Sequence, residues 1–214
     1  MKFLIHTCLR REWYVRKHLV PSMLAQGIPE SDIEVWVDWE RLGNLRAFVQ
    51  TMRECGERDG ATWHLQDDVL ISRRFYEVCQ QHDDGIVCGF ATHSYVKAGM
   101  FPGYVSPHCM WYSFPCIRIP NELAKEFAEW FDEASRRDNY QNWVAKNKYD
   151  DSFFRDFLIE KHKGIRALNL APNLVNHIDY LIGGSSINPT RRDLAVSAFW
   201  QDDDLVEDLK TKLK

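Results

Sequence analysis

Short apolar runs alternate with helical spacings along the first 90 residues. Apolar and polar positions alternate at 33–37, which is typical of a half-buried strand, whereas the apolar residues within 45–52 recur every three or four positions, which is typical of an amphipathic helix. The whole pattern predicts these elements in order: strand 3–5, helix 11–26, strand 33–37, a helix capped by Asn44, strand 61–65, a helix capped by Ser72 and strand 86–90. This alternation predicts an α/β fold, with a mostly parallel mixed sheet flanked by helices.

The second half of the chain follows a looser pattern. Residues 91–115 are rich in glycine, proline and aromatic residues and fit no strand–helix unit. Beyond them, the apolar spacing predicts a helix from Pro120, a helix from Asp150 or Ser152, a strand at 167–170 and an amphipathic helix from Asp203. We therefore expect one domain over residues 1–214, with a regular half at 1–95 and a more specialised half at 96–214.

Composition excludes several classes of protein. Hydrophobic residues make up 45% of the 214 residues and charged residues 27%, as in ordinary soluble domains. The net charge of −4 argues against binding to nucleic acid by bulk charge, so any such contact must come from local basic patches. No apolar stretch approaches the ~18 residues of a membrane span, and no signal-peptide core follows Met1. The six cysteines form no Cys-x-x-Cys pair, so we expect reduced thiols and a cytoplasmic location.

Polar residues follow the first three predicted strands. These are His6 and Thr7, then Asp38, then the run Gln66–Asp68. Ligands of open parallel sheets bind beyond the carboxyl ends of the strands, and a hard cation such as Mg²⁺ or Mn²⁺ prefers carboxylate oxygens there. Adjacent side chains of an extended segment point to opposite sides, so Asp67 and Asp68 can face one ligand only if the chain turns between them. The alternative is that both leave the strand into solvent and help to start the next helix.

The run His64–Val69 resembles the Asp-x-Asp region of the GT-A nucleotide-sugar glycosyltransferases. This resemblance implies a GT-A, Rossmann-like fold and transfer of a sugar from a nucleoside-diphosphate sugar, most often a UDP-sugar. It also implies that Asp68 binds the Mn²⁺ or Mg²⁺ that bridges the diphosphate. Gln66 stands where the family usually has an aspartate that contacts the ribose, which leaves the part of Asp67 in donor binding open. Residues 1–95 would then bind the donor. Residues 96–214 would bind the acceptor and complete the metal site.

Two later segments extend the resemblance. His177 matches the histidine with which many family members complete the metal site, and a neutral imidazole is a suitable ligand for Mn²⁺. The neighbouring Gly184, Ser185 and Ser186 offer backbone N–H groups and hydroxyls to a phosphate oxygen of the donor. The alternatives are a hydrogen-bonded framework histidine and a plain turn.

An acidic pair opens the helix predicted near residue 150. Asp150 and Asp151 resemble the position that supplies the catalytic base in inverting members of the family, and we favour Asp151 over Asp150. The alternative role is a helix cap, and a retaining enzyme would need neither residue as a base.

Other positions resemble contacts with the nucleotide. Thr7 and Arg10 match residues that bind the base and the diphosphate, and Asp38 matches an acid that contacts the ribose or the uracil. The alternatives are a solvated helix start for Arg10 and a turn for Asp38.

The aromatic stretch 101–114 is the predicted acceptor site, with Tyr104, Trp111 and Tyr112 as its rings, although a plain hydrophobic cluster is the alternative. The small size and the absence of targeting signals resemble bacteriophage proteins, which makes a hydroxymethylpyrimidine in phage DNA one candidate acceptor, with pairs such as Arg73–Arg74 on its phosphates. A saccharide or protein hydroxyl is the alternative acceptor.

The rival functions are a metal-dependent nucleotidyltransferase and a non-catalytic module that binds sugars or nucleic acids. The oligomeric state is left open.

Overall fold

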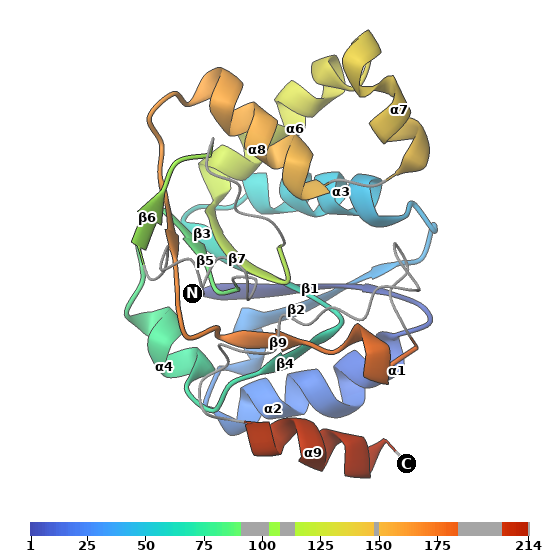
Figure 1. Cartoon of the computed structure of the whole chain (residues 1–214), viewed down its shortest axis with the longest axis vertical. Coiled ribbons are helices and arrows are strands. Elements are labelled where there is room, and N and C mark those ends of the chain that lie inside the picture. Colours follow the sequence, from blue (N-terminus) through green and yellow to red (C-terminus); the bar gives the residue numbers. More distant parts are fainter. Residues whose placement is uncertain (91–102, 108–113, 148–149, 184–202, 214) are drawn as a thin grey trace.

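A mixed β-sheet crosses the centre of the molecule, with helices on both of its faces (Figure 1). The computed structural model describes residues 1–90, 103–107, 114–147, 150–183 and 203–213. The sheet has the order β2-β1-β3-β7-β5-β8-β6. Its strands are β1 (Lys2–Cys8), β2 (Ile33–Asp38), β3 (Ala61–Gln66), β5 (Ile86–Cys88), β6 (Gly103–Val105), β7 (Cys116–Pro120) and β8 (Ala167–Asn169).

The sheet contains both parallel and antiparallel pairs of strands. β1 runs parallel to both β2 and β3, and β5 runs parallel to β8. β7 lies antiparallel between β3 and β5, and β6 lies antiparallel to β8 at the far edge. The predicted α/β class, with a mixed sheet flanked by helices, is therefore confirmed. Strands from both predicted halves of the chain form this one sheet.

Helices cover the sheet in two layers (Figure 1). The first layer consists of α3 (Asn44–Gly56), α6 (Asn121–Ala134), α7 (Asp138–Lys146) and α8 (Asp150–Lys161). On the other side lie α1 (Glu12–Tyr14), the π-helical turn η1 (Val15–Leu19), α2 (Val20–Ala25), α4 (Phe75–Gln80) and α9 (Asp203–Lys212). A small second sheet, β4 (Val69–Ile71) with β9 (Val175–His177), lies on this second side. The short 3₁₀ turns are η2 (Glu30–Asp32) and η3 (Asp179–Leu181).

Alternation along the strands builds a separate core on each face of the sheet. Phe3 and Ile5 of β1 pack into the core with β4 and β9, whereas Leu4 packs into the core with α3, α6 and α8. The second core is rich in aromatic rings: the ring centroid of Phe127 lies 5.8 Å from that of Phe48 and 5.2 Å from that of Phe154. These contacts fix α3 and α8, whose first residues, Asn44 and Asp150, are joined by a hydrogen bond.

Two predicted helix caps are wrong. The N-cap of α3 is Gly43, at φ +79°, and Asn44 is the first helical residue, with its side chain turned to another partner. α4 begins only at Phe75, with Arg74 as its N-cap, because Val69–Ile71 leave the turn as strand β4 and not as helix. None of the helices in the described part of the chain combines the length and the apolar character that crossing a bilayer requires.

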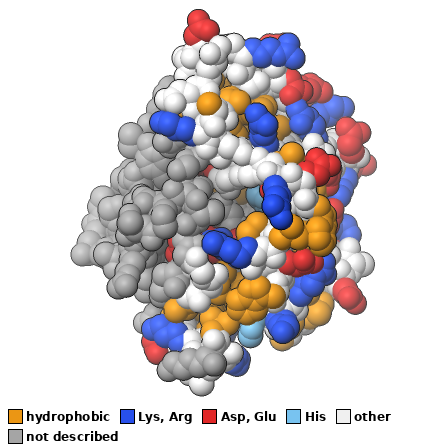
Figure 2. Space-filling view, turned by 90° about the vertical axis from the view of Figure 1, so that its right-hand side faces the viewer, with side chains coloured by type: hydrophobic (Ala, Val, Ile, Leu, Met, Phe, Trp, Pro, Cys, Tyr) orange, Lys and Arg blue, Asp and Glu red, His pale blue; other side chains and the backbone are white. Residues whose placement is uncertain are grey.

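Charges of both signs are mixed on the described surface. On the face shown in Figure 2, Lys and Arg side chains are interspersed with Asp and Glu side chains. Many of the arginines are paired: Arg16 with Glu12, Arg73 with Asp204, and Arg74 with Glu77. The described part of this face therefore presents no separate basic stripe.

Candidate functional site

The second sheet brings His177 to Asp68. β4 and β9 pair antiparallel with Val69 opposite His177, and the N–H of Ile178 donates to the carbonyl of Asp68 over 2.8 Å. This register places His177 Nε2 3.1 Å from Asp68 Oδ1. Two residues that lie far apart in the sequence thus meet beyond the carboxyl end of β3, and their role as metal ligands stays a prediction.

A turn at Asp67–Asp68 lets both carboxylates face Arg11. The Nη1 of Arg11 lies 2.8 Å from Asp67 Oδ1 and 2.6 Å from Asp68 Oδ2. All three side chains are buried, and Arg11 is only 4% exposed. Without this turn, adjacent side chains would point to opposite sides. Arg11 is therefore an internal cation that offsets the charge of the acidic pair.

Both carboxylate oxygens of Asp67 accept hydrogen bonds from other groups of the protein. Its Oδ2 accepts a hydrogen bond from the hydroxyl of Thr7 at 2.9 Å and another from the N–H of Cys8 at 3.1 Å, while its Oδ1 faces Arg11. These bonds tie the end of β1 to the turn after β3. Thr7 and Asp67 lie at the predicted place, and the geometry gives both a framework role; their contacts with a nucleotide stay predictions.

The two oxygens of Asp68 have different partners. Its buried Oδ1 lies 3.1 Å from His177 Nε2, and its Oδ2 accepts a hydrogen bond from Arg11. Burial raises the pKa of the Asp68 carboxyl, but His177 and Arg11 outweigh burial and lower that pKa below its usual value. Asp68 therefore offers an anionic oxygen beside an imidazole nitrogen.

This pair of donors fits a hard divalent cation. Carboxylate oxygen and neutral imidazole nitrogen are both ligands of Mn²⁺, and phosphate oxygens commonly complete such a site. No group of three or more His, Cys, Asp or Glu side chains within metal-binding reach occurs among the described residues. The protein would thus supply two ligands, and a bound diphosphate the others.

Arg10 lies against the start of the Gly-Gly-Ser-Ser run. Gly183 has φ +109°, and a Cβ built on it would come within 3.8 Å of the Arg10 guanidinium carbon. A cation therefore stands beside the position from which this run continues. Gly184, Ser185 and Ser186 lie outside the described residues, so their part in donor binding stays a prediction.

The Asp38 carboxylate is used within a turn. Its Oδ1 accepts the N–H of Leu42 at 2.7 Å and its Oδ2 accepts the N–H of Gly43 at 2.9 Å. This is the turn role given above as the alternative to a nucleotide contact. Gln66 ends β3 in a half-buried position, where its ribose contact stays a prediction.

His6 lies in the second half of β1, within electrostatic reach of Asp67, Asp38 and Asp68. Its ring is in edge contact with the indole of Trp36, with ring centroids 5.5 Å apart. Burial lowers its pKa, against the opposing effect of Asp67, Asp38 and Asp68. The imidazole is therefore neutral at pH 7.

Asp150 begins α8 and faces the first residue of α3. Its Oδ1 accepts a hydrogen bond from Asn44 Nδ2 at 2.8 Å, and the side chain is buried. Burial, and then the neighbouring Asp151 carboxylate, raise the pKa of Asp150 to about 7. Asp151 instead accepts the N–H of Ser152 at 2.7 Å, the kind of local bond made by a residue at a helix start.

The predicted acceptor residue Tyr104 lies far from Asp68. It is 66% exposed on β6, the edge strand at the other end of the sheet from β2, and register places it in the same row as Trp63. Four strand spacings separate β6 from β3, or about 19 Å. The structure does not bring Tyr104 to the acidic pair. Trp111 and Tyr112 lie outside the described residues.

Sequence reasoning missed two residues of the site. Arg11 precedes the buried Tyr14 and Val15 by three and four positions, a spacing that places it on the buried face of the helix. That spacing was the available signal. Asn44 offered none, because its partner Asp150 is distant in the sequence.

Comparison with known proteins gives no assignment. No protein-family model and no curated protein matches the chain. Among solved structures, the galactosyltransferase LgtC in complex with donor and acceptor sugar analogues is similar, with a TM-score of 0.39 and 12% identity, over 100% of this chain and 96% of that chain. A likeness of this size says nothing of the substrate.

Proposed function

We propose that the protein is a glycosyltransferase that moves a sugar from a nucleoside-diphosphate sugar, a UDP-sugar, to an acceptor hydroxyl. The observation that carries the proposal is the pairing of the buried Asp68 Oδ1 with His177 Nε2, 3.1 Å apart, beyond the carboxyl end of β3. An anionic oxygen and an imidazole at that edge of an α/β sheet suit a cation that accompanies a diphosphate.

Asp68 and His177 would hold Mn²⁺ or Mg²⁺. When bound, the cation supplies positive charge that stabilises the departing nucleoside diphosphate. Arg11 holds Asp68 by its Oδ2 and so turns Oδ1 towards His177. Arg10, beside Gly183, is a second positive group for the phosphates.

Asp150 is the better candidate for the base that takes the proton of the acceptor hydroxyl. A carboxylate with a pKa of about 7 is half ionised at neutral pH and can both accept and hold a proton, whereas Asp151 is engaged at the helix start. Asn44 orients the Asp150 carboxylate by its 2.8 Å hydrogen bond. This order reverses the preference that the sequence suggested.

The rival nucleotidyltransferase hypothesis has less support. Such an enzyme commonly gathers several carboxylates around two metal ions. In the ranges that the structure describes, no group of three potential ligands occurs. One cation with two protein ligands suits sugar transfer better.

The nature of the acceptor follows less directly from the geometry. A DNA acceptor would need arginines free to bind phosphates, yet Arg16, Arg73 and Arg74 each pair with a carboxylate, and Arg11 is buried. These pairs support a saccharide or protein hydroxyl over a hydroxymethylpyrimidine in DNA. Offering a donor together with hydroxymethylated oligonucleotides, with the nucleosides then weighed by mass spectrometry, tests the DNA alternative.

Donor hydrolysis tests the proposed reaction without knowledge of the acceptor. With UDP-glucose, UDP-galactose or UDP-N-acetylglucosamine and Mn²⁺, we expect slow release of UDP, which stops when the metal is chelated. His177→Ala should lower this rate at least about tenfold, since even residues that only support the ligands of a metal site commonly contribute 10–100-fold. The exposed Asp208→Ala in α9 is the matched control. A binding module would release no UDP from any donor. A nucleotidyltransferase would instead join UTP to a sugar phosphate and release pyrophosphate.

A further inference from the structure

A cavity of about 670 Å³ lies beside the end of β2 and α3, and none of the predicted site residues lines it. Trp36, Val37, Val49 and Phe131 provide its apolar surface. Its volume is within the range of about 300–1,000 Å³ that small-molecule sites occupy.

The inner wall of the cavity is held by hydrogen bonds. Trp36 Nε1 donates to Glu54 Oε1 at 2.9 Å, and Gln50 Nε2 donates to the same oxygen at 3.2 Å. Arg53, also in the wall, pairs with Asp132 of α6. These bonds fix the polar groups of the wall, so its shape exists before any ligand binds.

Three exposed side chains line this cavity: Trp39, Glu40 and Arg46. Trp39 is 64% exposed, the largest exposure of any tryptophan in the described ranges. Glu40 and Arg46 line the same cavity, and neither side chain forms a hydrogen bond or an ion pair with any residue that the structure describes. An indole face, a carboxylate and a guanidinium are therefore available around one opening.

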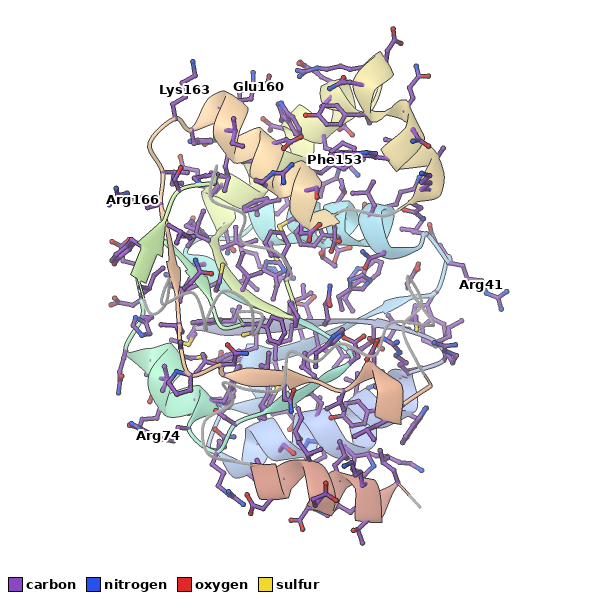
Figure 3. All side chains as sticks on the ribbon, in the orientation of Figure 1. Arg41, Arg74, Phe153, Glu160, Lys163 and Arg166 are labelled. Atoms are coloured by element: carbon purple, nitrogen blue, oxygen red, sulfur yellow. The ribbon has the colours of Figure 1, made fainter. Side chains whose placement is uncertain are left out.

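The loop that carries this indole is braced. The Asp38 carboxylate accepts the N–H groups of Leu42 and Gly43, and the N–H of Trp39 donates to the carbonyl of Val37 at 2.8 Å. Arg41, in the same loop, points away from the body of the molecule and does not line the cavity (Figure 3). The indole is thus presented by an ordered turn.

The charges of the lining cancel. Arg46 and Arg53 line the cavity together with Glu40 and Glu54, so a nucleotide or another multiply charged anion would meet as much repulsion as attraction. A neutral ligand with many hydroxyls meets no such penalty, because carboxylates accept and guanidinium groups donate hydrogen bonds. The apolar face of a sugar ring can lie on the indole.

We propose that this cavity binds a saccharide, with a sugar ring on Trp39 and its hydroxyls on Glu40 and Arg46. The site is separate from Asp68 and His177 and does not depend on the proposed transfer reaction. It gives the Asp38 turn a function, which is to present Trp39.

The test uses saturation-transfer NMR and calorimetry with maltotriose, lactose and N,N′-diacetylchitobiose as probes. We expect at least one of them to bind with a Kd in the range of roughly 0.1–10 mM, which corresponds to about −3 to −5 kcal/mol. Trp39→Ala and Arg46→Ala should each weaken that binding by about tenfold or more. Trp13→Ala removes another exposed indole, 41% accessible, away from the cavity and should leave the affinity unchanged.

Three results would overturn the proposal: no transfer of saturation to any of the three saccharides at about 10 mM, saccharide binding that survives Trp39→Ala, or UMP competing with the saccharide for the cavity. Circular dichroism of each variant shows whether the fold is kept. UDP release from the donor should be unaffected in Trp39→Ala, so failure of this site and failure of the proposed reaction give different results.

Discussion

Asp150→Asn is expected to keep UDP binding and to lower the rate of sugar transfer by roughly 10²–10⁴-fold, the usual contribution of a general base. Asparagine has nearly the same shape and can keep its contact with Asn44 of α3, so the fold around α8 should persist. What it loses is the ability to accept a proton. The measurement is kcat with saturating donor, together with the Kd of UDP.

The pH profile adds a readout that a structural role would not give. Below its pKa the Asp150 carboxyl is protonated and cannot act as a base, so the rate should rise with pH and level off above about 7. In Asp150→Asn this rise should vanish. Asp151→Asn is the control and should retain most of the rate; if it loses the rate and Asp150→Asn does not, Asp151 is the base, and full activity in both variants would exclude an aspartate base at this helix start.

Arg11→Leu is expected to lower the free energy of unfolding by about 3–5 kcal/mol. The substitution leaves Asp67 and Asp68 buried without the cation that lies 2.8 Å and 2.6 Å from their oxygens. Removing one partner of a buried ion pair commonly costs this much, because the remaining charge is uncompensated. At ~2–4 °C for each kcal/mol in a chain of this size, Tm should fall by about 10 °C.

Two variants control this experiment. Arg16→Leu breaks an exposed pair with Glu12, so its effect on unfolding should stay below about 1 kcal/mol. Arg11→Lys keeps the charge and loses the planar fork, so it should fall between the wild type and Arg11→Leu. A Tm for Arg11→Leu that equals that of the wild type would show that the acidic pair needs no internal cation.

The amino-terminal strands could be predicted because their side chains alternate between two cores. β1, β2 and β3 follow the apolar pattern closely, and the helices between them show regular spacing. β4 has no alternation to detect, because every residue of Val69–Ile71 is buried. β7 has only the short alternation Ile117-Arg118-Ile119, next to the irregular aromatic stretch that precedes it. The pairing of β4 with β9 could not be foreseen from either short segment alone.

The contacts of the candidate site could be foreseen only in part. Asp68 and His177 were paired through a family resemblance, and the structure places them in contact. The burial of Arg11 could have been inferred from its spacing to Tyr14 and Val15, whereas the bond from Asn44 to Asp150 depends on tertiary packing that the residues near them do not encode.

The central claim is that Asp68 and His177 bind a cation together with a nucleoside diphosphate, and calorimetry of UDP with and without Mn²⁺ tests it most directly. We expect Mn²⁺ to tighten UDP binding of the wild type at least about tenfold, or 1.4 kcal/mol. Asp68→Asn, which keeps the size of the side chain, should abolish this gain, and Asp208→Ala should retain it. Equal affinity for UDP with and without Mn²⁺ in the wild type, or a full Mn²⁺ effect in Asp68→Asn, would contradict the account.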